Sequence, residues 1–283
     1  MSAESTSVKA VSLNGEIVVP GDKSITHRTV LFGAIAEGRT VVHTTALGRD
    51  NFGTMRIMRQ LGVQVEGSVT AALLPIALNE GLTDFTLAPG DTCEIRVSGN
   101  GLLGLRAAKG ELNCGNSGTT ARLLCGLLAG QNFRSTLVGD ASLSKRPFKR
   151  VSEPLSKMGA VFSGETLPLD VDGSSLKGIE YASPHASAQV KSAIILAGLY
   201  TEEGVTVTEP RRTRDHTERM LSAMGIKIVE SECADGAWRV QLPARQERGV
   251  AKAIDVVVPG DFSAAGFFLV AGAIFPNSKI TIK

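Results

Sequence analysis

The sequence contains few aromatic residues and few cysteines, and both scarcities exclude kinds of site. Phe, Trp and Tyr make up 5% of its 283 residues, so an aromatic-lined pocket is not expected. The 4 cysteines form no C-x-x-C pair and have no histidine nearby at a metal-ligand spacing. This argues against a zinc site and against a disulfide framework, and it favours a reducing, cytoplasmic setting.

Strong net charge and long apolar runs are also lacking. The formal net charge is +2, so the overall electrostatics do not favour nucleic acid as a partner. Residues 1–9 are polar and lack the apolar segment of a secretory signal. The longest apolar stretches, 193–199 and 264–275, are too short or too rich in small residues to span a bilayer. We therefore predict no membrane partner.

The most informative feature that is present is an internal repeat. A polar start, an apolar helix, a glycine and a β-branched strand follow one another in four copies, which begin at Gly21, Asn116, Ser187 and Gly260. In the first three copies a charged amphipathic helix and a short strand come next, and a glycine separates them: Gly62, Gly159 and Gly225. The sequence therefore predicts an α/β protein of repeated β-α-β-α-β-β subdomains. The fourth copy stops after its first strand, so we expect the natural chain to be longer.

The starts of the helices are candidate anion sites. Asp, Ser, Asn or Thr precedes each apolar helix and caps the free N–H groups of its first turn. The same end carries the positive pole of the helix dipole, which favours a phosphate or carboxylate. Basic residues lie near these starts, namely Lys23, Arg28, Arg122, Arg146, Lys191 and Arg214. Convergence of the starts predicts a site for a small molecule with several anionic groups, whereas ordinary capping and solvated surface charge remain the alternative.

Five segments carry a family resemblance: GDKSITHR (21–28), GNSGTTAR (115–122), GDASLSKRP (139–147), ASAQVKS (186–192) and TRDHTE (213–218). From about residue 8 to the last residue, the sequence resembles the 5-enolpyruvylshikimate-3-phosphate synthase family. That family has two lobes, each of three repeated subdomains, around a cleft. The resemblance implies that residues 21–259 form one complete lobe. Residues 1–20 and 260–283 would then belong to a second, incomplete lobe.

The resemblance also implies the substrate-binding residues. Those that match contacts with shikimate 3-phosphate are Lys23, Ser24, Arg28, Ser187, Gln189 and Arg214. Those that contact phosphoenolpyruvate or line its pocket are Asn116, Gly118, Arg122 and Arg146. Lys23 and Gln189 border both ligands. Ala188 stands where many members have a second serine, so another group would supply one hydrogen bond to the phosphate.

The implied reaction is a step of aromatic amino acid biosynthesis that uses no metal or organic cofactor. The 5-hydroxyl of shikimate 3-phosphate attacks C2 of phosphoenolpyruvate, a tetrahedral intermediate forms, and phosphate leaves. The family's acid and base residues match positions beyond Lys283, so no catalytic residue is assigned here. We accordingly expect the chain alone to be inactive and the whole enzyme to be a monomer.

Two other functions stay open. One is a non-catalytic module that binds a phosphorylated ligand and needs a complementing chain. The other is the sister transferase that acts on UDP-N-acetylglucosamine. That enzyme typically carries a reactive cysteine in the loop matching 139–147, and this loop has none.

Overall fold

Three sheets with a shared strand order organise the protein. The computed structural model describes residues 12–45, 47–69, 74–75 and 92–283. The middle unit runs β6 (Leu112–Asn113), α3 (Gly118–Ala129), β7 (Arg134–Val138), α4 (Lys149–Met158), β8 (Val161–Phe162) and β9 (Leu169–Asp172). The next runs β10 (Glu180–Ala182), α5 (Ala188–Gly198), β11 (Val205–Glu209), α6 (His216–Ala223), β12 (Val229–Glu232) and β13 (Trp238–Leu242). Both have the predicted β-α-β-α-β-β order, and the middle unit also contains a 3₁₀ turn at Leu143–Lys145.

The first unit takes its opening strand from elsewhere in the chain. It runs α1 (Lys23–Ile35), β2 (Glu37–Thr44), α2 (Arg49–Gln60), β3 (Gln64–Val69), β4 (Leu74–Pro75) and β5 (Cys93–Asn100). In the other two sheets a parallel pair, β6–β7 or β10–β11, is followed by antiparallel strands. Here the parallel partner of β2 is β14 (Asp255–Val257), which follows the third unit and the short helix α7 (Arg245–Arg248). The repeat pattern did not predict that β14 would complete the sheet of the first unit.

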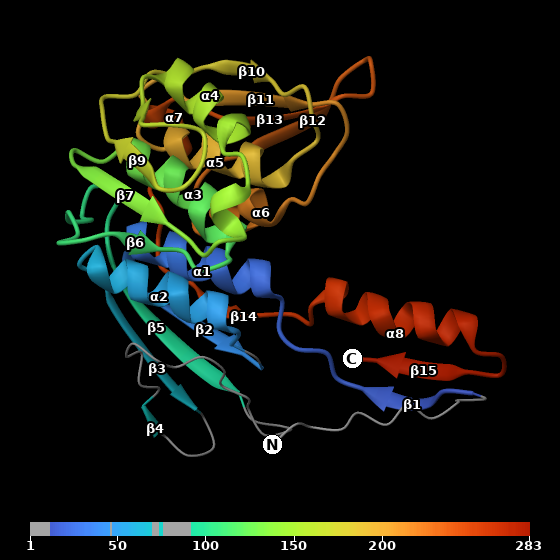
Figure 1. Ribbon diagram of the computed structural model, residues 1–283. Coiled ribbons are helices and arrows are strands. Elements are labelled where there is room, and N and C mark those ends of the chain that lie inside the picture. Colours follow the sequence, from blue (N-terminus) through green and yellow to red (C-terminus); the bar gives the residue numbers. More distant parts are fainter. Residues whose placement is uncertain (1–11, 46, 70–73, 76–91) are drawn as a thin grey trace.

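Each unit has one inner and one outer helix, and the inner helices form the core. On α1, α3 and α5 apolar or small residues occur on every side, and nearly the whole of each helix is buried. The outer helices α2, α4 and α6 carry charged residues on their solvent face and apolar residues toward the sheets. Figure 1 shows the inner helices between the sheets. Two of them, α3 and α5, pack closely at Gly126, where an added Cβ would lie 2.3 Å from the carbonyl oxygen of Ala193.

The predicted glycine stops are confirmed, but one predicted strand is wrong. Gly62, Gly159 and Gly225 have φ angles of +86°, +113° and +90°, which suit glycine after a helix. Strands follow the first two glycines within two residues, whereas residues 226–228 are not a strand and β12 begins at Val229. The N–H of Lys227 donates instead to the carbonyl of Arg248 at 2.7 Å. The alternating Ile-Lys-Ile pattern reflects packing beside α7 rather than sheet pairing.

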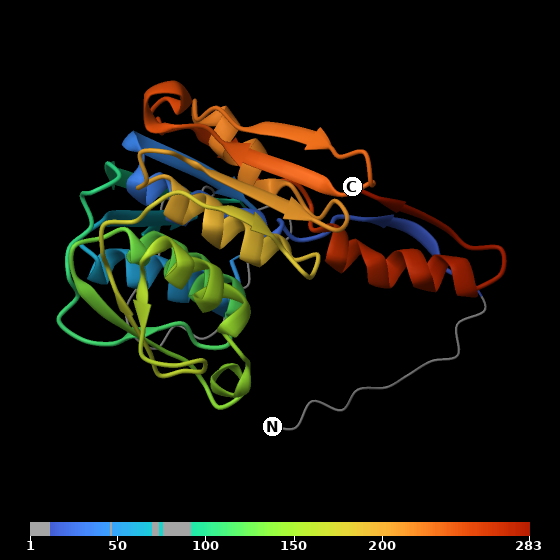
Figure 2. The same cartoon turned by 90° about the horizontal axis from the view of Figure 1, so that it is seen from above.

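A small separate group contains the two ends of the described chain. Strand β1 (Asn14–Ile17) pairs in parallel with β15 (Lys279–Ile282), and α8 (Phe262–Ile274) packs beside them. Figures 1 and 2 show this group next to the body formed by the three sheets. The division into a complete lobe at 21–259 and an incomplete one stays a prediction. Within the described residues, no helix is long and apolar enough to cross a membrane.

The contact between α3 and α5 generates the first testable prediction. Gly126→Ala places a methyl group against the Ala193 backbone, so we expect a loss of about 1–3 kcal/mol in unfolding free energy from overpacking. Gly53→Ala in α2 is the matched control, because its Cβ would meet no atom within 4 Å. Alanine there should be neutral or stabilising by up to about 1 kcal/mol. Urea unfolding of both variants tests this, and equal effects would contradict it.

Candidate substrate-binding site

The starts of the three inner helices lie together and are joined by side-chain hydrogen bonds. Gln189, in the first turn of α5, donates through Nε2 to Thr119 Oγ1 of α3 at 3.0 Å. Arg28 of α1 donates to Ser192 Oγ of α5 at 3.3 Å. His27 of α1 lies 3.4 Å from Thr120 Oγ1 of α3. The structure therefore shows the convergence that the repeats predict.

The start of α3 holds two guanidinium groups beside Gly118. Arg122 donates to the Gly118 carbonyl at 3.3 Å and to Gln189 Oε1 at 3.1 Å. A Cβ on Gly118 would lie 2.5 Å from one terminal nitrogen of Arg122 and 3.4 Å from one of Arg146. Burial, and next the positive charge of Arg146, lower the pKa of Arg122. Two like charges thus meet at the positive end of a helix, where an anion would be stabilised.

A short chain of hydrogen bonds holds Arg146 in this place. Its guanidinium donates to Asn116 Oδ1 at 2.5 Å and to Ser142 Oγ at 3.4 Å. Asn116 in turn donates to Asp140 Oδ2 at 2.8 Å. The other Asp140 oxygen accepts the backbone N–H groups of Ser142 and Leu143 at 3.0 and 2.8 Å. The Leu143 N–H is the largest cause of the lowered pKa of Asp140, so this exposed carboxylate stays ionised.

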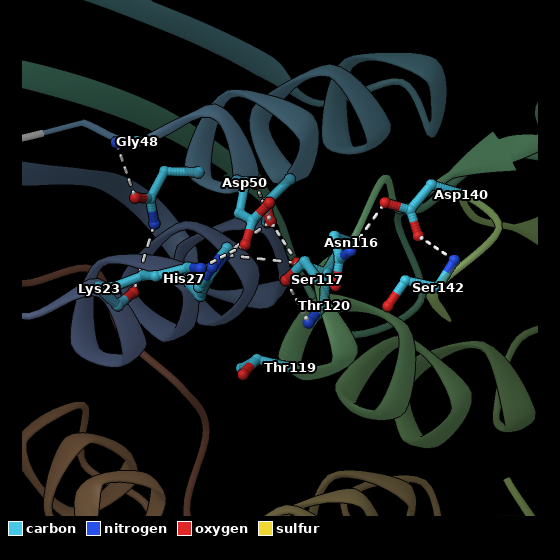
Figure 3. A network of polar contacts seen from close by, with 12 residues as sticks. Lys23, His27, Gly48, Asp50, Asn116, Ser117, Thr119, Thr120, Asp140 and Ser142 are labelled. Atoms are coloured by element: carbon cyan, nitrogen blue, oxygen red, sulfur yellow. Dashed lines mark hydrogen bonds and ion pairs between the residues drawn. The ribbon is translucent and has the colours of Figure 1, made fainter. Parts of the chain in front are cut away.

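Lys23 opens α1 and faces the first turn of α2. Its ammonium forms an ion pair with Asp50 while 53% of the side chain remains exposed. Next to it, the buried His27 shares a hydrogen bond of 2.8 Å with Thr54 Oγ1, which lies 2.7 Å from Thr120 Oγ1. Figure 3 shows the polar contacts between the start of α1 and Thr120, and beside them the separate contacts of Asp140 with Asn116 and Ser142. Through Thr54 of α2, these hydrogen bonds link the first turns of α1 and α3.

Arg28 is deeply buried beneath the helix starts. Its side chain donates to Thr217 Oγ1 at 2.9 Å and to the Ser24 carbonyl at 3.1 Å. Burial is the largest cause that lowers the pKa of Arg28, to about 10, so the guanidinium is still charged at neutral pH. Arg214 is exposed, and its positive charge also lowers that pKa, which places it within electrostatic range.

Ser187 caps the start of α5, as its sequence position predicts. Its Oγ accepts the Val190 N–H at 3.5 Å, and its own N–H donates to Glu209 at 3.1 Å. Ala188 is half-buried, and its carbonyl accepts the Ser192 hydroxyl at 2.6 Å. In the part of the chain that the structure describes, no hydrogen bond joins the Ser24 hydroxyl or the Arg214 guanidinium to another predicted substrate residue.

The acidic and hydroxyl residues that hold the predicted site residues in place were missed by sequence reasoning. They include Asp50, Asp140, Glu209 and Thr217. Only Asp140 could have been found from the sequence. An Asp side chain often accepts the backbone N–H groups two and three residues later and so forms a local turn. The others contact residues 22 to 189 positions away, and no local pattern marks such pairs.

Of two cavities in the protein, one borders this region and the other lies away from it. One of about 310 Å³ lies between α4 and the loop before α5, and it is lined by Arg150, His185 and Ser187 among others. Another of about 650 Å³ lies near Gly130 and Tyr200, at the far ends of α3 and α5, and contains none of the predicted substrate residues. Among the described residues, no group of three His, Cys, Asp or Glu side chains could hold a metal ion.

Comparison with known proteins identifies the family. A family model described as EPSP synthase (3-phosphoshikimate 1-carboxyvinyltransferase) matches residues 8–102 and 89–283. The chain belongs to the EPSP synthase family. The 3-phosphoshikimate 1-carboxyvinyltransferase of Bacillus subtilis (strain 168) is 46% identical over 279 residues, which are 97% of this chain and 58% of that protein. That of Bacillus cereus (strain AH187) is 47% identical over 275 residues, 96% of this chain and 57% of that protein.

A solved structure agrees with the sequence relatives. The 2.37 Å structure of EPSP synthase from Acinetobacter baumannii has a TM-score of 0.75 and 40% sequence identity, over 95% of this chain and 55% of that chain. The predicted α/β fold of repeated subdomains and the family resemblance are thereby confirmed. The chain spans about 58% of the length of the curated relatives it matches.

The buried histidine of the network generates a pH prediction. Burial, and next the charge of Lys23, lower the pKa of His27 from 6.5 to about 3. Because the unfolded chain binds this proton more readily, the contribution of His27 to stability is complete above pH 6.5 and is lost as the pH falls toward 3. The slope is about 1.4 kcal/mol per pH unit. Urea unfolding at several pH values should show a shallower decline for His27→Gln than for the wild type, and parallel curves would contradict the prediction.

Proposed function

We propose that this chain binds shikimate 3-phosphate and phosphoenolpyruvate at the joined starts of α1, α3 and α5. It would thereby provide these contacts for transfer of the enolpyruvyl group to the 5-hydroxyl of shikimate 3-phosphate. The relatives named above carry this activity in their names. The proposal extends it to a chain that spans 58% of one such relative.

One observation carries the proposal: three arginines of the site, Arg28, Arg122 and Arg146, are oriented by neutral oxygen atoms. Arg28 is held by hydroxyls and a carbonyl, Arg122 by a carbonyl and an amide oxygen, and Arg146 by an amide oxygen and a hydroxyl. Among the described residues none of the three has a carboxylate within ion-pair distance. These guanidinium groups are thus positioned without a direct ion-pair partner, an arrangement that suits phosphate and carboxylate groups.

The proposed division of the site into two sides follows the family resemblance. Gly118, Arg122 and Arg146 form the phosphoenolpyruvate side, with Asn116 holding Arg146. The shikimate 3-phosphate side comprises Lys23, Ser24, Arg28, Ser187, Ala188, Gln189 and Arg214. Lys23 and Gln189 would border both ligands, and the contacts of Gln189 with Arg122 and Thr119 support this for Gln189.

In the proposed addition, these residues bind and orient the two substrates. Positive charge beside Gly118 stabilises the phosphate and carboxylate of phosphoenolpyruvate as the tetrahedral intermediate forms. Bringing the 5-hydroxyl within reach of C2 lowers the entropic part of the barrier. The proton transfers are assigned to no residue of this chain. We further propose residues 21–259 as one lobe, and a monomeric, cytoplasmic whole enzyme.

A ligand-binding function without turnover is the second candidate, because the chain spans only 58% of the length of its relative. Incubation of the 283-residue chain with both substrates, with phosphate release and the enolpyruvyl product measured, separates the two. Turnover supports the transferase. Calorimetric binding of shikimate 3-phosphate without turnover supports the ligand-binding function. The absence of both binding and turnover would contradict both functions.

Removal of the Lys23 charge should weaken the binding of shikimate 3-phosphate. A hydrogen bond to a charged group contributes about 1.5–3 kcal/mol, so Lys23→Ala should raise Kd by about ten- to a hundredfold. Isothermal titration calorimetry measures the change. Lys157→Ala is the control, because this exposed lysine of α4 pairs with Glu153 outside the site. An unchanged Kd for Lys23→Ala would remove Lys23 from the site.

A methyl group at Gly118 should displace the guanidinium of Arg122, which would lie 2.5 Å from the new Cβ. We expect Gly118→Ala to weaken binding of phosphoenolpyruvate in the presence of shikimate 3-phosphate by about tenfold or more, since a charge-assisted contact is lost. Fluorescence or calorimetric titration measures this, with Gly53→Ala as the control. Equal affinities of Gly118→Ala and the control would contradict the placement of Gly118.

A further inference from the structure

Three buried charged side chains lie directly behind the start of α5. Lys191 of α5, Glu209 at the end of β11 and Glu218 of α6 are each only 1% exposed. The Lys191 ammonium lies 2.9 Å from Glu209 Oε2 and 2.7 Å from Glu218 Oε1. We call these three residues the buried charge cluster.

Burying the three charged side chains of the cluster costs desolvation free energy that apolar side chains would not cost. Removing charges from water costs several kcal/mol per ion, and well-packed apolar residues of similar volume often give equal or greater stability. Burial is also the largest influence on the pKa of Glu218 and raises it, while Lys191 opposes this. Stability alone therefore does not account for the cluster, and its outward contacts indicate another role.

Glu209 connects the cluster to two substrate-binding segments. One carboxylate oxygen accepts the backbone N–H of Ser187, the cap of α5, at 3.1 Å. The hydroxyl of Thr213, which precedes Arg214, donates to both oxygens at 3.0 and 2.7 Å. The carboxylate that pairs with Lys191 thus fixes the start of α5 and the segment that carries Arg214.

The sequence neighbours of the cluster hold Arg28. Ser192 follows Lys191 on α5, and Thr217 precedes Glu218 on α6. Their hydroxyl oxygens lie 2.7 Å apart, and both accept hydrogen bonds from the Arg28 guanidinium, at 3.3 and 2.9 Å. A movement of Lys191 or Glu218 would therefore also displace the partners of Arg28.

We propose that Lys191 is a positioning residue for shikimate 3-phosphate, acting through Glu209 and Glu218 to hold Ser187, Arg28 and the Arg214 segment in one arrangement. This inference rests on the proposed function. Lys191 itself is too deeply buried to touch the ligand. Its ammonium joins α5, through Lys191 itself, to the end of β11 at Glu209 and to α6 at Glu218.

Lys191→Met removes the cation and retains much of the side-chain volume. Two buried carboxylates then lose the cation between them, and their like charges repel. We expect Glu209 to turn away from the Ser187 N–H and the Kd for shikimate 3-phosphate to rise about tenfold or more. Glu209→Gln, which changes shape less, should shift the affinity in the same direction and serves if Lys191→Met does not fold.

Arg248→Met is the matched control. Arg248 is 3% exposed, and its guanidinium donates to the Leu199 carbonyl at the opposite end of α5. This variant also loses a buried cation that anchors α5, so it should lose stability but keep the Kd for shikimate 3-phosphate within about twofold. Equal losses of affinity in Arg248→Met and Lys191→Met would show a general effect of destabilisation and overturn the proposal.

Amide hydrogen exchange of Ser187, followed by NMR without ligand, separates this inference from the proposed function. We expect faster exchange in Lys191→Met and Glu209→Gln than in the wild type and Arg248→Met. A wild-type chain that does not bind shikimate 3-phosphate would contradict the proposed function while the exchange data still test the geometry. Unchanged exchange and unchanged affinity in both cluster variants would overturn the positioning role.

Discussion

Close packing of the three inner helices is the constraint on which the rest of the structure depends. At Gly126 the backbone of α5 approaches α3 so closely that a Cβ would overlap Ala193. Each inner helix is buried on nearly all sides, so its direction is set by contacts rather than by solvent. Because all three begin on the same side of the body, their free N–H groups and dipoles point toward one region. The site is a consequence of this packing.

The sequence predicted the elements well because their signals are local. Capping residues marked the starts of the inner helices, and Gly62 and Gly159 marked the ends of outer ones with positive φ angles. Pairings between distant segments carried no such signal. Strand β14 pairs with β2 although more than 200 residues separate them, and the Lys227 N–H donates to the distant Arg248 carbonyl rather than to a neighbouring strand.

For the candidate site as well, the sequence predicted features with a local signal but not the contacts between distant segments. The basic residues were found because each lies near a helix start within a recognisable segment. Their partners were not found: Arg28 is held by Thr217, 189 positions later, and Ser187 by Glu209, 22 positions later. These contacts arise only after the units have packed together, which is why the geometry of the site required the structure.

The partners of the basic residues divide the site into two electrostatic layers. Facing the ligand side, Arg122 and Arg146 are oriented by neutral amide, carbonyl and hydroxyl oxygens, so their charges remain available. Behind it, Lys191 is opposed by two carboxylates. At Lys191 the two carboxylates balance the charge and fix the structure, whereas Arg122 and Arg146 are held by neutral dipoles without being balanced. Under the proposed function, an anionic substrate would supply the missing counter-charge at Arg122 and Arg146 without displacing an internal carboxylate, so little reorganisation of these two side chains would oppose its binding.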